Sequence, residues 1–320
     1  MKYIYTIFVV FITFSACSKK DIALNETINN PSKKMQEFIS NISLHAKKKK
    51  PDFFIIPQNA IELAYNNLSI KEGINLEYMN TIDAIGIEAL FYDGDEIPVY
   101  ERHEMLQEFS KNKKVLVSDY LSNNNLLNDA IQKNTNESFL CFPRLQENYD
   151  YTIIPEFTIN ENTNDIVELE AAKNYLYLIN SENYSSKEDF INSIMNTNFD
   201  IILIDLFFHG KPLSKTDILK LKIKKNGGKR LVISYVNIGA AEKYRYYFNK
   251  DQWQINNPHW LMKPYKGYPD EIFVKYWAKE WHEIIYKKND SYINKIIEAG
   301  FDGAYLDNVK SYEYLFSDKF

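Results

Sequence analysis

Short apolar runs alternate along most of the chain with longer amphipathic or polar stretches. Eight of these runs have the length and composition of buried strands, at residues 53–57, 84–91, 115–118, 139–142, 175–179, 201–206, 231–236 and 304–306. The intervening stretches are long enough for helices, as at 187–195, 216–225 and 290–299. Strands that alternate with helices predict a parallel sheet covered by helices.

The number of strands favours one particular α/β architecture. No Gly-, Ser- or Pro-rich linker divides the chain, so residues 32–320 are expected to form one domain. Eight strands in one such domain predict a (β/α)8 TIM barrel. An open doubly wound sheet is the alternative, and the lack of a glycine-rich phosphate loop after the first strand disfavours it.

The domain is expected to begin with a helix. Met35, Phe38, Ile39 and Ile42 recur on one helical face after Ser32, which is a suitable N-cap. The lysines at 47–50 are expected to form the solvated end of that helix.

The first residues predict export. Lys2 precedes an apolar run at 3–14, which is too short to span a bilayer, and small residues lead to Cys17. This pattern is similar to a bacterial lipoprotein signal, with residues 1–16 removed, Cys17 lipidated and 17–31 acting as a polar tether. An ordinary cleaved signal is the alternative. Ser18 favours anchoring in the outer membrane.

Composition excludes several kinds of site. The net charge is −5 and the basic residues are dispersed, which argues against nucleic-acid binding. Cys141, flanked by apolar residues, is the remaining cysteine and is expected to be buried, so neither a disulfide nor a cysteine metal site is expected. The five histidines lack ligand spacing, and we expect no metal ion and no cofactor.

Polar side chains follow most of the predicted strands. They are Gln58 and Asn59, Glu88, Asp119, Asp205, Glu242 with Arg245, and Asp307 with Asn308. Any one of them can be a cap or a turn residue. Together they predict a ring of acids at one barrel mouth, because catalytic side chains project from the carboxyl ends of barrel strands. Two carboxyl groups in such a ring suit glycoside hydrolysis.

Four motifs in order carry a resemblance to a known family. They lie at 199–205 (FDIILID), 234–245 (SYVNIGAAEKYR), 274–277 (VKYW) and 300–308 (GFDGAYLDN). Together they resemble glycoside hydrolase family 114, which includes endo-α-1,4-polygalactosaminidases. The resemblance is clear over residues 173–314.

The N-terminal half also resembles this family, but it is displaced. The helix at 35–40 and the strands at 54–59 and 82–88 follow the Asp-Asn strand in the usual family order, whereas here they precede it. The resemblance therefore implies a circular permutation, in which Phe320 lies near the helix that begins at Ser32 so that the barrel still closes.

The resemblance also implies roles for individual residues. The two catalytic acids fall on Asp307 and Glu88, with Glu88 as general acid and Asp307 as nucleophile, or the reverse, because a sequence does not give the carboxyl separation that distinguishes retention from inversion. The substrate-binding or supporting residues are expected to be Asp205, Glu242, Arg245, Asn59, Asn308, Tyr235 and Asp119. Lys310 and Ala240 depart from the family pattern, which usually has acidic residues at these positions.

The expected protein is a lipid-anchored, monomeric glycoside hydrolase that acts on an α-1,4-galactosamine-containing polysaccharide. It would meet the membrane through its anchor alone. Trp253, Trp260 and Trp277 could stack on sugar rings, or could pack beneath loops. The alternatives are a non-catalytic polysaccharide-binding lipoprotein with a retained barrel, and a docking partner in a polysaccharide-handling complex.

Overall fold

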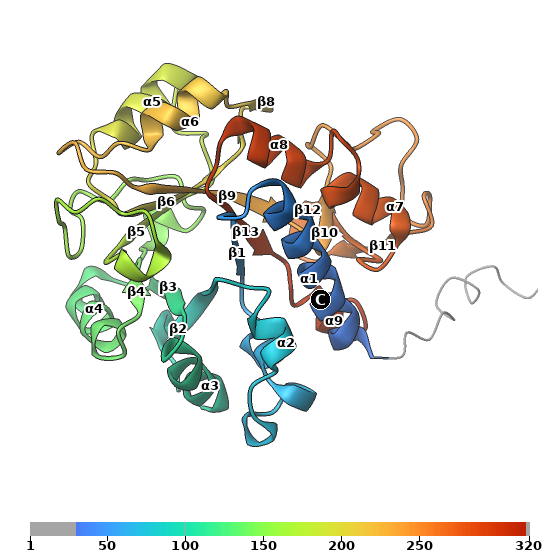
Figure 1. The fold of residues 1–320 in the computed structure, drawn as a ribbon, viewed down its shortest axis with the longest axis horizontal. Coiled ribbons are helices and arrows are strands. Elements are labelled where there is room, and N and C mark those ends of the chain that lie inside the picture. Colours follow the sequence, from blue (N-terminus) through green and yellow to red (C-terminus); the bar gives the residue numbers. More distant parts are fainter. Residues whose placement is uncertain (1–29, 99, 318–320) are drawn as a thin grey trace, which may run out of the picture.

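Eight parallel strands form the centre of the protein in a computed structural model that describes residues 30–98 and 100–317 (Figure 1). All eight predicted runs are strands: β1 (Phe54–Pro57), β2 (Ala84–Glu96), β3 (Lys114–Leu121), β4 (Leu140–Cys141), β5 (Tyr175–Leu178), β6 (Ile201–Asp205), β9 (Leu231–Asn237) and β13 (Gly303–Asp307). The predicted signal at 1–16, Cys17 and most of the tether lie outside the described residues.

The strands follow one another in the order of a barrel. Five form a sheet in the order β1-β13-β9-β6-β5, and three form a second sheet in the order β2-β3-β4. A parallel bridge between Gln58 and Gly86 joins the two sheets. In the described part of the chain no strand pairing joins β4 to β5, and rings such as Phe142 and Tyr175 meet there instead, 5.7 Å apart. The barrel order is thus present, but strand pairing does not close the ring.

The first strand pairs with the last one. β1 lies in parallel register with β13, with Phe54 opposite Gly303 and Pro57 opposite Leu306. Helix α1 (Pro31–Lys49) packs beside α8 (Tyr292–Ala299) and α9 (Ser311–Tyr314), so that the blue and red ends of the chain in Figure 1 adjoin. The two ends of the described chain therefore complete one structural unit, as in any (β/α)8 barrel.

The N-cap of the first helix lies two residues earlier than expected. Its N-cap is Asn30, whose side chain accepts a hydrogen bond from the backbone N–H of Lys33, and the predicted cap Ser32 lies inside the helix instead. Three lysines occupy the last turn, where they complement the helix dipole.

Helices cover the outside of the strands. The remaining α-helices of the described chain are α2 (Leu76–Met79), α3 (Glu101–Ser110), α4 (Leu127–Asn136), α5 (Lys187–Met195), α6 (Lys215–Leu221) and α7 (Lys279–His282). Helix α6 ends earlier than predicted, at Leu221, and the chain after it pairs Ile223 with Lys229. No helix in the described ranges is both long and apolar enough to cross a membrane.

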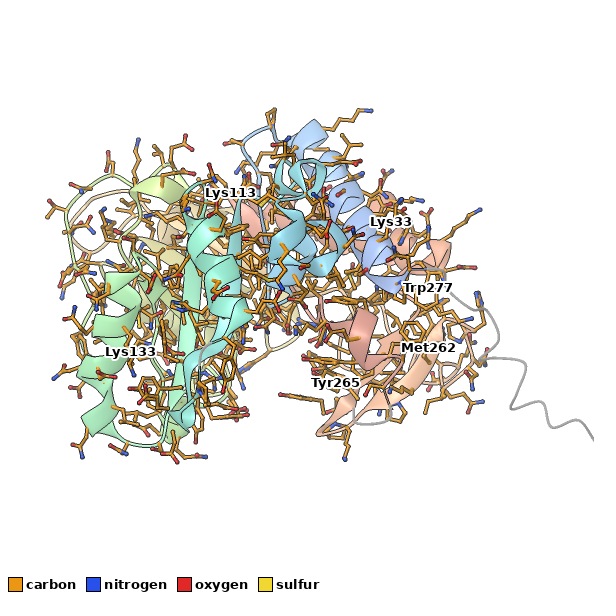
Figure 2. All side chains as sticks on the ribbon, turned by 90° about the horizontal axis from the view of Figure 1, so that it is seen from below. Lys33, Lys113, Lys133, Met262, Tyr265 and Trp277 are labelled. Atoms are coloured by element: carbon orange, nitrogen blue, oxygen red, sulfur yellow. The ribbon has the colours of Figure 1, made fainter. Side chains whose placement is uncertain are left out.

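Two antiparallel excursions extend from the barrel. One is the short pair β7 (Phe207–Phe208) and β8 (Lys211–Pro212). The other is a three-stranded sheet in the order β10-β12-β11, built from β10 (Ala240–Glu242), β11 (Leu261–Tyr265) and β12 (Tyr268–Val274). Figure 2 labels Tyr265 on this second excursion, on the opposite side of the molecule from Lys133.

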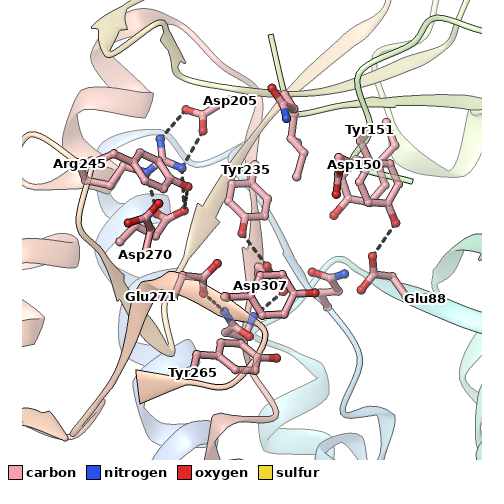
Figure 3. Close-up of a pocket in the computed structure, with 18 of the residues that line it drawn as sticks. Glu88, Asp150, Tyr151, Asp205, Tyr235, Arg245, Tyr265, Asp270, Glu271 and Asp307 are labelled. Atoms are coloured by element: carbon pink, nitrogen blue, oxygen red, sulfur yellow. Dashed lines mark hydrogen bonds and ion pairs between the residues drawn. The ribbon is translucent and has the colours of Figure 1, made fainter. Parts of the chain in front are cut away.

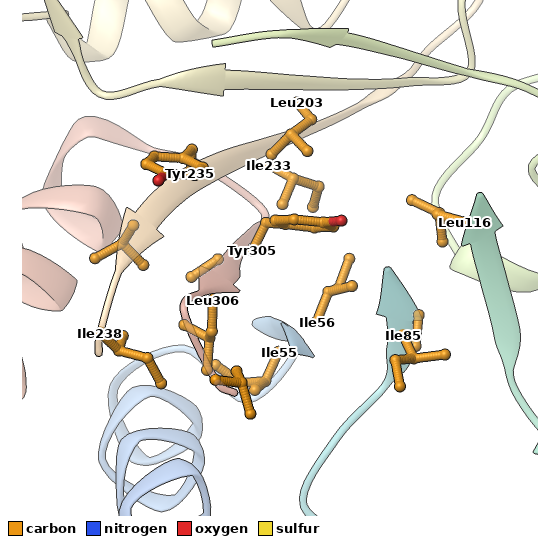
Figure 4. Close-up of a cluster of buried hydrophobic side chains, with 14 of the residues drawn as sticks. Ile55, Ile56, Ile85, Leu116, Leu203, Ile233, Tyr235, Ile238, Tyr305 and Leu306 are labelled. Atoms are coloured by element: carbon orange, nitrogen blue, oxygen red, sulfur yellow. The ribbon is translucent and has the colours of Figure 1, made fainter. Parts of the chain in front are cut away.

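A large tyrosine fills the barrel interior. Tyr305 lies between Ile56 and Ile233 (Figure 4) and is almost fully buried. Its hydroxyl would lie only 1.9 Å from a Cβ atom at position 86, so Gly86 leaves the space that the ring occupies. Cys141 is buried and free, as predicted.

Candidate active site

A pocket of about 810 Å3 lies where the carboxyl ends of the strands meet. Among the described residues, acidic side chains dominate its lining: Glu88, Asp93, Asp150, Glu182, Asp205, Glu242, Asp270, Glu271 and Asp307. The arginines and lysines in this lining are Arg144, Arg245 and Lys310. The structure therefore brings the predicted acids from distant strands into one strongly acidic site.

Asp307 is held by two donors at the end of β13. Its Oδ2 accepts the phenolic hydrogen of Tyr235 at 2.6 Å, and its Oδ1 accepts the backbone N–H of Asn308 at 2.6 Å. Burial and the negative charge of Glu88 raise the pKa of Asp307 to about 7, although the Tyr235 hydrogen bond acts in the opposite direction. Asp307 can thus carry a proton at neutral pH.

Glu88 occupies a different environment on β2. Its Oε1 accepts the hydroxyl hydrogen of Tyr151 at 2.5 Å (Figure 3). The same oxygen lies 3.6 Å from Nη2 of Arg144. The Glu88 side chain is 31% exposed, and that of Arg144 only 8%. Glu88 thus has a hydroxyl donor and a guanidinium beside it. The two acids named by the sequence therefore meet in one pocket with unlike surroundings.

Asn59 supports Glu88 through the backbone. Its Oδ1 accepts the N–H of Glu88 at 3.1 Å and also a hydrogen bond from Arg102 at 3.0 Å. Asn308 supports Asp307 differently, because its backbone N–H donates to the Asp307 carboxylate. Both asparagines have left-handed backbone conformations, with φ of 58° and 57°, which Asn tolerates better than most residues. Each one turns the chain just past the end of a strand.

Arg245 is the centre of a buried ion cluster. Its Nη2 lies 2.7 Å from Oδ2 of Asp205, and its Nε lies 2.6 Å from Oε2 of Glu242. The side chains of Arg245 and Glu242 are 4% and 1% exposed. All three residues line the pocket, as the sequence predicted, and their charges are largely satisfied by one another.

Asp119 does not line the pocket, and the prediction that it contacts substrate is wrong. It is fully buried, and its Oδ1 accepts the backbone N–H groups of Leu90, Phe91 and Tyr92 at 2.9, 2.9 and 3.2 Å. Its Oδ2 accepts a hydrogen bond from Asn134 at 2.8 Å. Asp119 therefore fixes the irregular stretch of β2 that follows Glu88.

The tryptophans do not line the pocket either. Trp260 is buried and packs edge-on against Trp253, and Trp277 stacks on Phe316, so packing is their role. Tyrosines line the pocket instead. Tyr149 and Tyr268 are 46% and 50% exposed, which leaves their rings accessible to a bound molecule.

The sequence analysis missed several residues at the site. Glu271 is the most important, because it lies on β12, outside the eight barrel strands, where no polar strand-end signal marks it. Tyr151 and Arg144, which contact Glu88, lie in the segment after β4. Only the three-dimensional course of these segments brings them to Glu88.

Lys310 and Ala240, which depart from the family pattern, lie in different surroundings. Lys310 lines the pocket, with Nζ 3.4 Å from Oε1 of Glu62 and 3.6 Å from Oε2 of Glu313, so its charge is partly balanced. Ala240 is fully buried and is absent from the described pocket lining. Within the described ranges, no group of three or more His, Cys, Asp or Glu side chains is arranged to hold a metal ion.

Comparison with known proteins relates the C-terminal half of the chain to a family of glycoside hydrolases. The model of glycoside-hydrolase family GH114 matches residues 161–319, which include Asp205, Arg245 and Asp307. An uncharacterized protein of Thermotoga maritima is 39% identical over 121 residues, or 38% of this chain and 36% of the relative. One of Methanocaldococcus jannaschii is 40% identical over 124 residues, or 39% and 34%. The match thus spans about a third of each relative.

The matched segment contains the ion cluster, Glu271 and the Asp-Asn strand end, so most of the pocket belongs to it. Membership of a glycoside-hydrolase family supports hydrolysis of glycosidic bonds as the chemistry of this site. Residues 161–319 place the chain in glycoside-hydrolase family GH114.

Proposed function

We propose that this protein cleaves an α-1,4-galactosamine-containing polysaccharide, with Asp307 and Glu88 as its two catalytic carboxyl groups. The observation that carries the proposal is the meeting of these two acids in one pocket from strands at opposite ends of the chain. Glycoside hydrolases need one carboxylic acid and one carboxylate beside the scissile bond. The pocket supplies both.

The surroundings favour Asp307 as the general acid. Its raised pKa, about 7, keeps a proton available for the leaving oxygen. Glu88, with Tyr151 and Arg144 beside it, is the second carboxyl group of the pair. Asp307 would protonate the glycosidic oxygen as the bond from that oxygen to the anomeric carbon breaks. Glu88 would attack that carbon, or deprotonate the water that does so.

The charge of the pocket supports a cationic substrate. Nine described acidic side chains line it, against two arginines and one lysine, and both arginines have acidic neighbours. A galactosamine polymer carries a positive charge wherever it lacks acetyl groups, and an acidic pocket attracts it by Coulomb steering. The exposed Tyr149 and Tyr268 would provide stacking surfaces for its rings.

The location and the element order are part of the same proposal. We infer lipid attachment at Cys17, with anchoring in the outer membrane favoured, from the sequence pattern alone. We also infer a circular permutation of the family barrel. This inference rests on the order of the family motifs in the sequence, and the pairing of β1 with β13 is compatible with it.

The decisive experiment measures the release of reducing ends from partly deacetylated α-1,4-galactosaminogalactan. Residues 18–320 would be compared with the same chain carrying Glu88→Gln or Asp307→Asn. We expect each substitution to reduce turnover at least about a hundredfold. No turnover by the unsubstituted chain, together with tight saturable binding of the polymer, would instead identify a non-catalytic polysaccharide-binding protein.

A further inference from the structure

Glu271 faces another glutamate across a pair of strands. It lies on β12 directly opposite Glu242 on β10, as Cα partners in an antiparallel ladder. Like charges at opposed positions of a ladder repel one another. Both side chains also line the pocket, and the end of β13 places Asp307 in the same lining.

The neighbouring cation is already engaged by Glu242. Arg245 contacts both oxygens of Glu242, through Nε at 2.6 Å and Nη2 at 3.1 Å. Among the described residues, no lysine or arginine lies within ion-pair distance of Glu271. Of the two opposed glutamates, Glu242 has a compensating charge and Glu271 has none.

The two oxygens of Glu271 are not equivalent. Oε2 accepts hydrogen bonds from Nδ2 of Asn237 at 2.9 Å and from Nδ2 of Asn308 at 3.1 Å. The orientation of the Asn237 amide is fixed, because its Oδ1 accepts the backbone N–H groups of Gly239 and Ala240 at 3.2 and 2.9 Å. Two donors directed at Oε2 leave no room there for a proton.

The other oxygen, Oε1, is available to bind a ligand. No hydrogen-bond partner of Oε1 occurs among the described residues, and Glu271 belongs to the pocket lining. A proton carried by this side chain would therefore reside on Oε1.

We propose that Glu271 is a neutral carboxylic acid that binds the substrate, and that its Oε1–H donates a hydrogen bond to an acceptor oxygen of the sugar beside Asp307. This inference rests on the proposed hydrolase function. Glu271 would select for a hydroxyl, ring or carbonyl oxygen at that position. An ammonium group could not accept the hydrogen bond from Oε1–H of Glu271, because it has no acceptor lone pair.

The electrostatic environment supports a bound proton. Burial raises the pKa of Glu271 to about 8, and the charges of Glu242 and Asp307 act in the same direction, against the two asparagine hydrogen bonds. The other titratable groups around it are Tyr235 on β9 and the hairpin residues Tyr265 and Tyr268. Burial raises the pKa of each of these tyrosines, so they add no charge near neutral pH.

The first test needs no substrate. The full chain is labelled with 13C at its glutamate side-chain carboxyls, so that infrared titration separates the glutamic acids from Asp307. We expect a protonated glutamate band that persists at pH 7, is lost with a midpoint near 8, and is absent from Glu271→Gln. Absence of this band from the unsubstituted protein at pH 7 overturns the proposal, whether or not the variant folds.

The second test measures binding of a galactosamine oligosaccharide from pH 6 to 9. Glu88→Gln is used to suppress turnover, and it is compared with Glu88→Gln combined with Glu271→Gln. We expect the single variant to lose about tenfold more affinity than the double variant as pH rises through 8, because the amide of the double variant is a permanent donor. Affinity that instead rises with pH in the single variant identifies a carboxylate that binds a cation, and refutes the proposal.

The two tests separate the possible failures. Glu298→Gln, which removes one exposed negative charge on α8, serves as the matched control for net charge and should leave both readouts unchanged. If no oligosaccharide binds, the proposed hydrolase function fails, while the infrared titration still decides where the Glu271 proton resides.

Discussion

Tyr235 donates its phenolic hydrogen to Oδ2 of Asp307 at 2.6 Å, from β9 to the neighbouring strand β13. The same carboxyl group receives the backbone N–H of Asn308 on its other oxygen. Both donors stabilise the ionised form, and they oppose the effects of burial and of Glu88. The protonation of Asp307 near neutral pH is thus a balance that one hydroxyl group can shift.

Removal of that hydroxyl should alter the pH profile of the enzyme. In Tyr235→Phe the carboxylate loses a donor, so we expect the pKa of Asp307 to rise above about 7 and the alkaline limb of kcat/KM to shift upward. The measurement is kcat/KM from pH 5 to 9. Tyr276→Phe is the control, because its hydroxyl bonds the backbone oxygen of Pro31, away from the described pocket lining. A profile that is unmoved in Tyr235→Phe would contradict the assignment of Asp307 as the acid.

Replacement of Asp307 should change stability in a pH-dependent way. The raised pKa means that the folded protein binds a proton between about pH 4 and 7 that the unfolded chain releases, so the stability contributed by protonated Asp307 is lost as pH rises through about 7. Asp307→Asn should therefore be more stable than the parent at pH 8, by about 2–4 kcal/mol. Near pH 4 the difference should disappear. Urea denaturation at both values measures this, and an equal gain at both would indicate a cause other than titration.

The ion cluster around Arg245 should be sensitive to loss of its cation. Arg245→Ala leaves Glu242 buried without a compensating charge, and we expect it to lower the free energy of unfolding by about 3–5 kcal/mol. Arg245→Lys should cost less, because it keeps the charge but not both contacts. The control is Lys111→Ala, whose partner Glu108 is exposed, and its effect should stay below about 1 kcal/mol. Similar losses at the two sites would mean that Arg245 is not effectively buried.

The proposed permutation can be tested by reversing it. A rearranged chain would begin at residue 161 and join residue 317 to residue 30 through a short Gly-Ser linker. Because α1 packs beside α9 and β1 pairs with β13, we expect this chain to fold with the same circular dichroism spectrum and the same catalytic activity. A control chain opened inside β9 should not fold, since that strand pairs on both sides. Failure of the rearranged chain alone would argue against a tolerated permutation.

The strands were predictable because each is an apolar run that ends at a polar residue. The same rule located Asp307 and Glu88, since carboxyl ends of parallel strands share one edge. It failed for Asp119, whose carboxylate lies at such an end but accepts backbone hydrogen bonds from the irregular part of β2. A strand end identifies the edge of the sheet, but it does not reveal whether a side chain meets solvent or neighbouring backbone.

The residues that were missed depend on contacts between distant segments. Glu271 acquires its character from the pairing of β12 with β10 and from the amides of Asn237 and Asn308. Tyr151 reaches Glu88 from the segment after β4. Neither relationship leaves a periodic or compositional signal in the chain. The family resemblance names residue types at motif positions, and it says nothing of partners outside the motifs.

Gly86 and Tyr305 occupy what is in effect a single volume inside the barrel, because the tyrosine hydroxyl lies where the first carbon of any other side chain at position 86 would be. The two positions are therefore one unit for protein engineering. A library that varies residue 86 alone should yield only misfolded or distorted proteins. One that enlarges residue 86 while shrinking residue 305 could reshape the barrel interior and leave the catalytic strand ends in place.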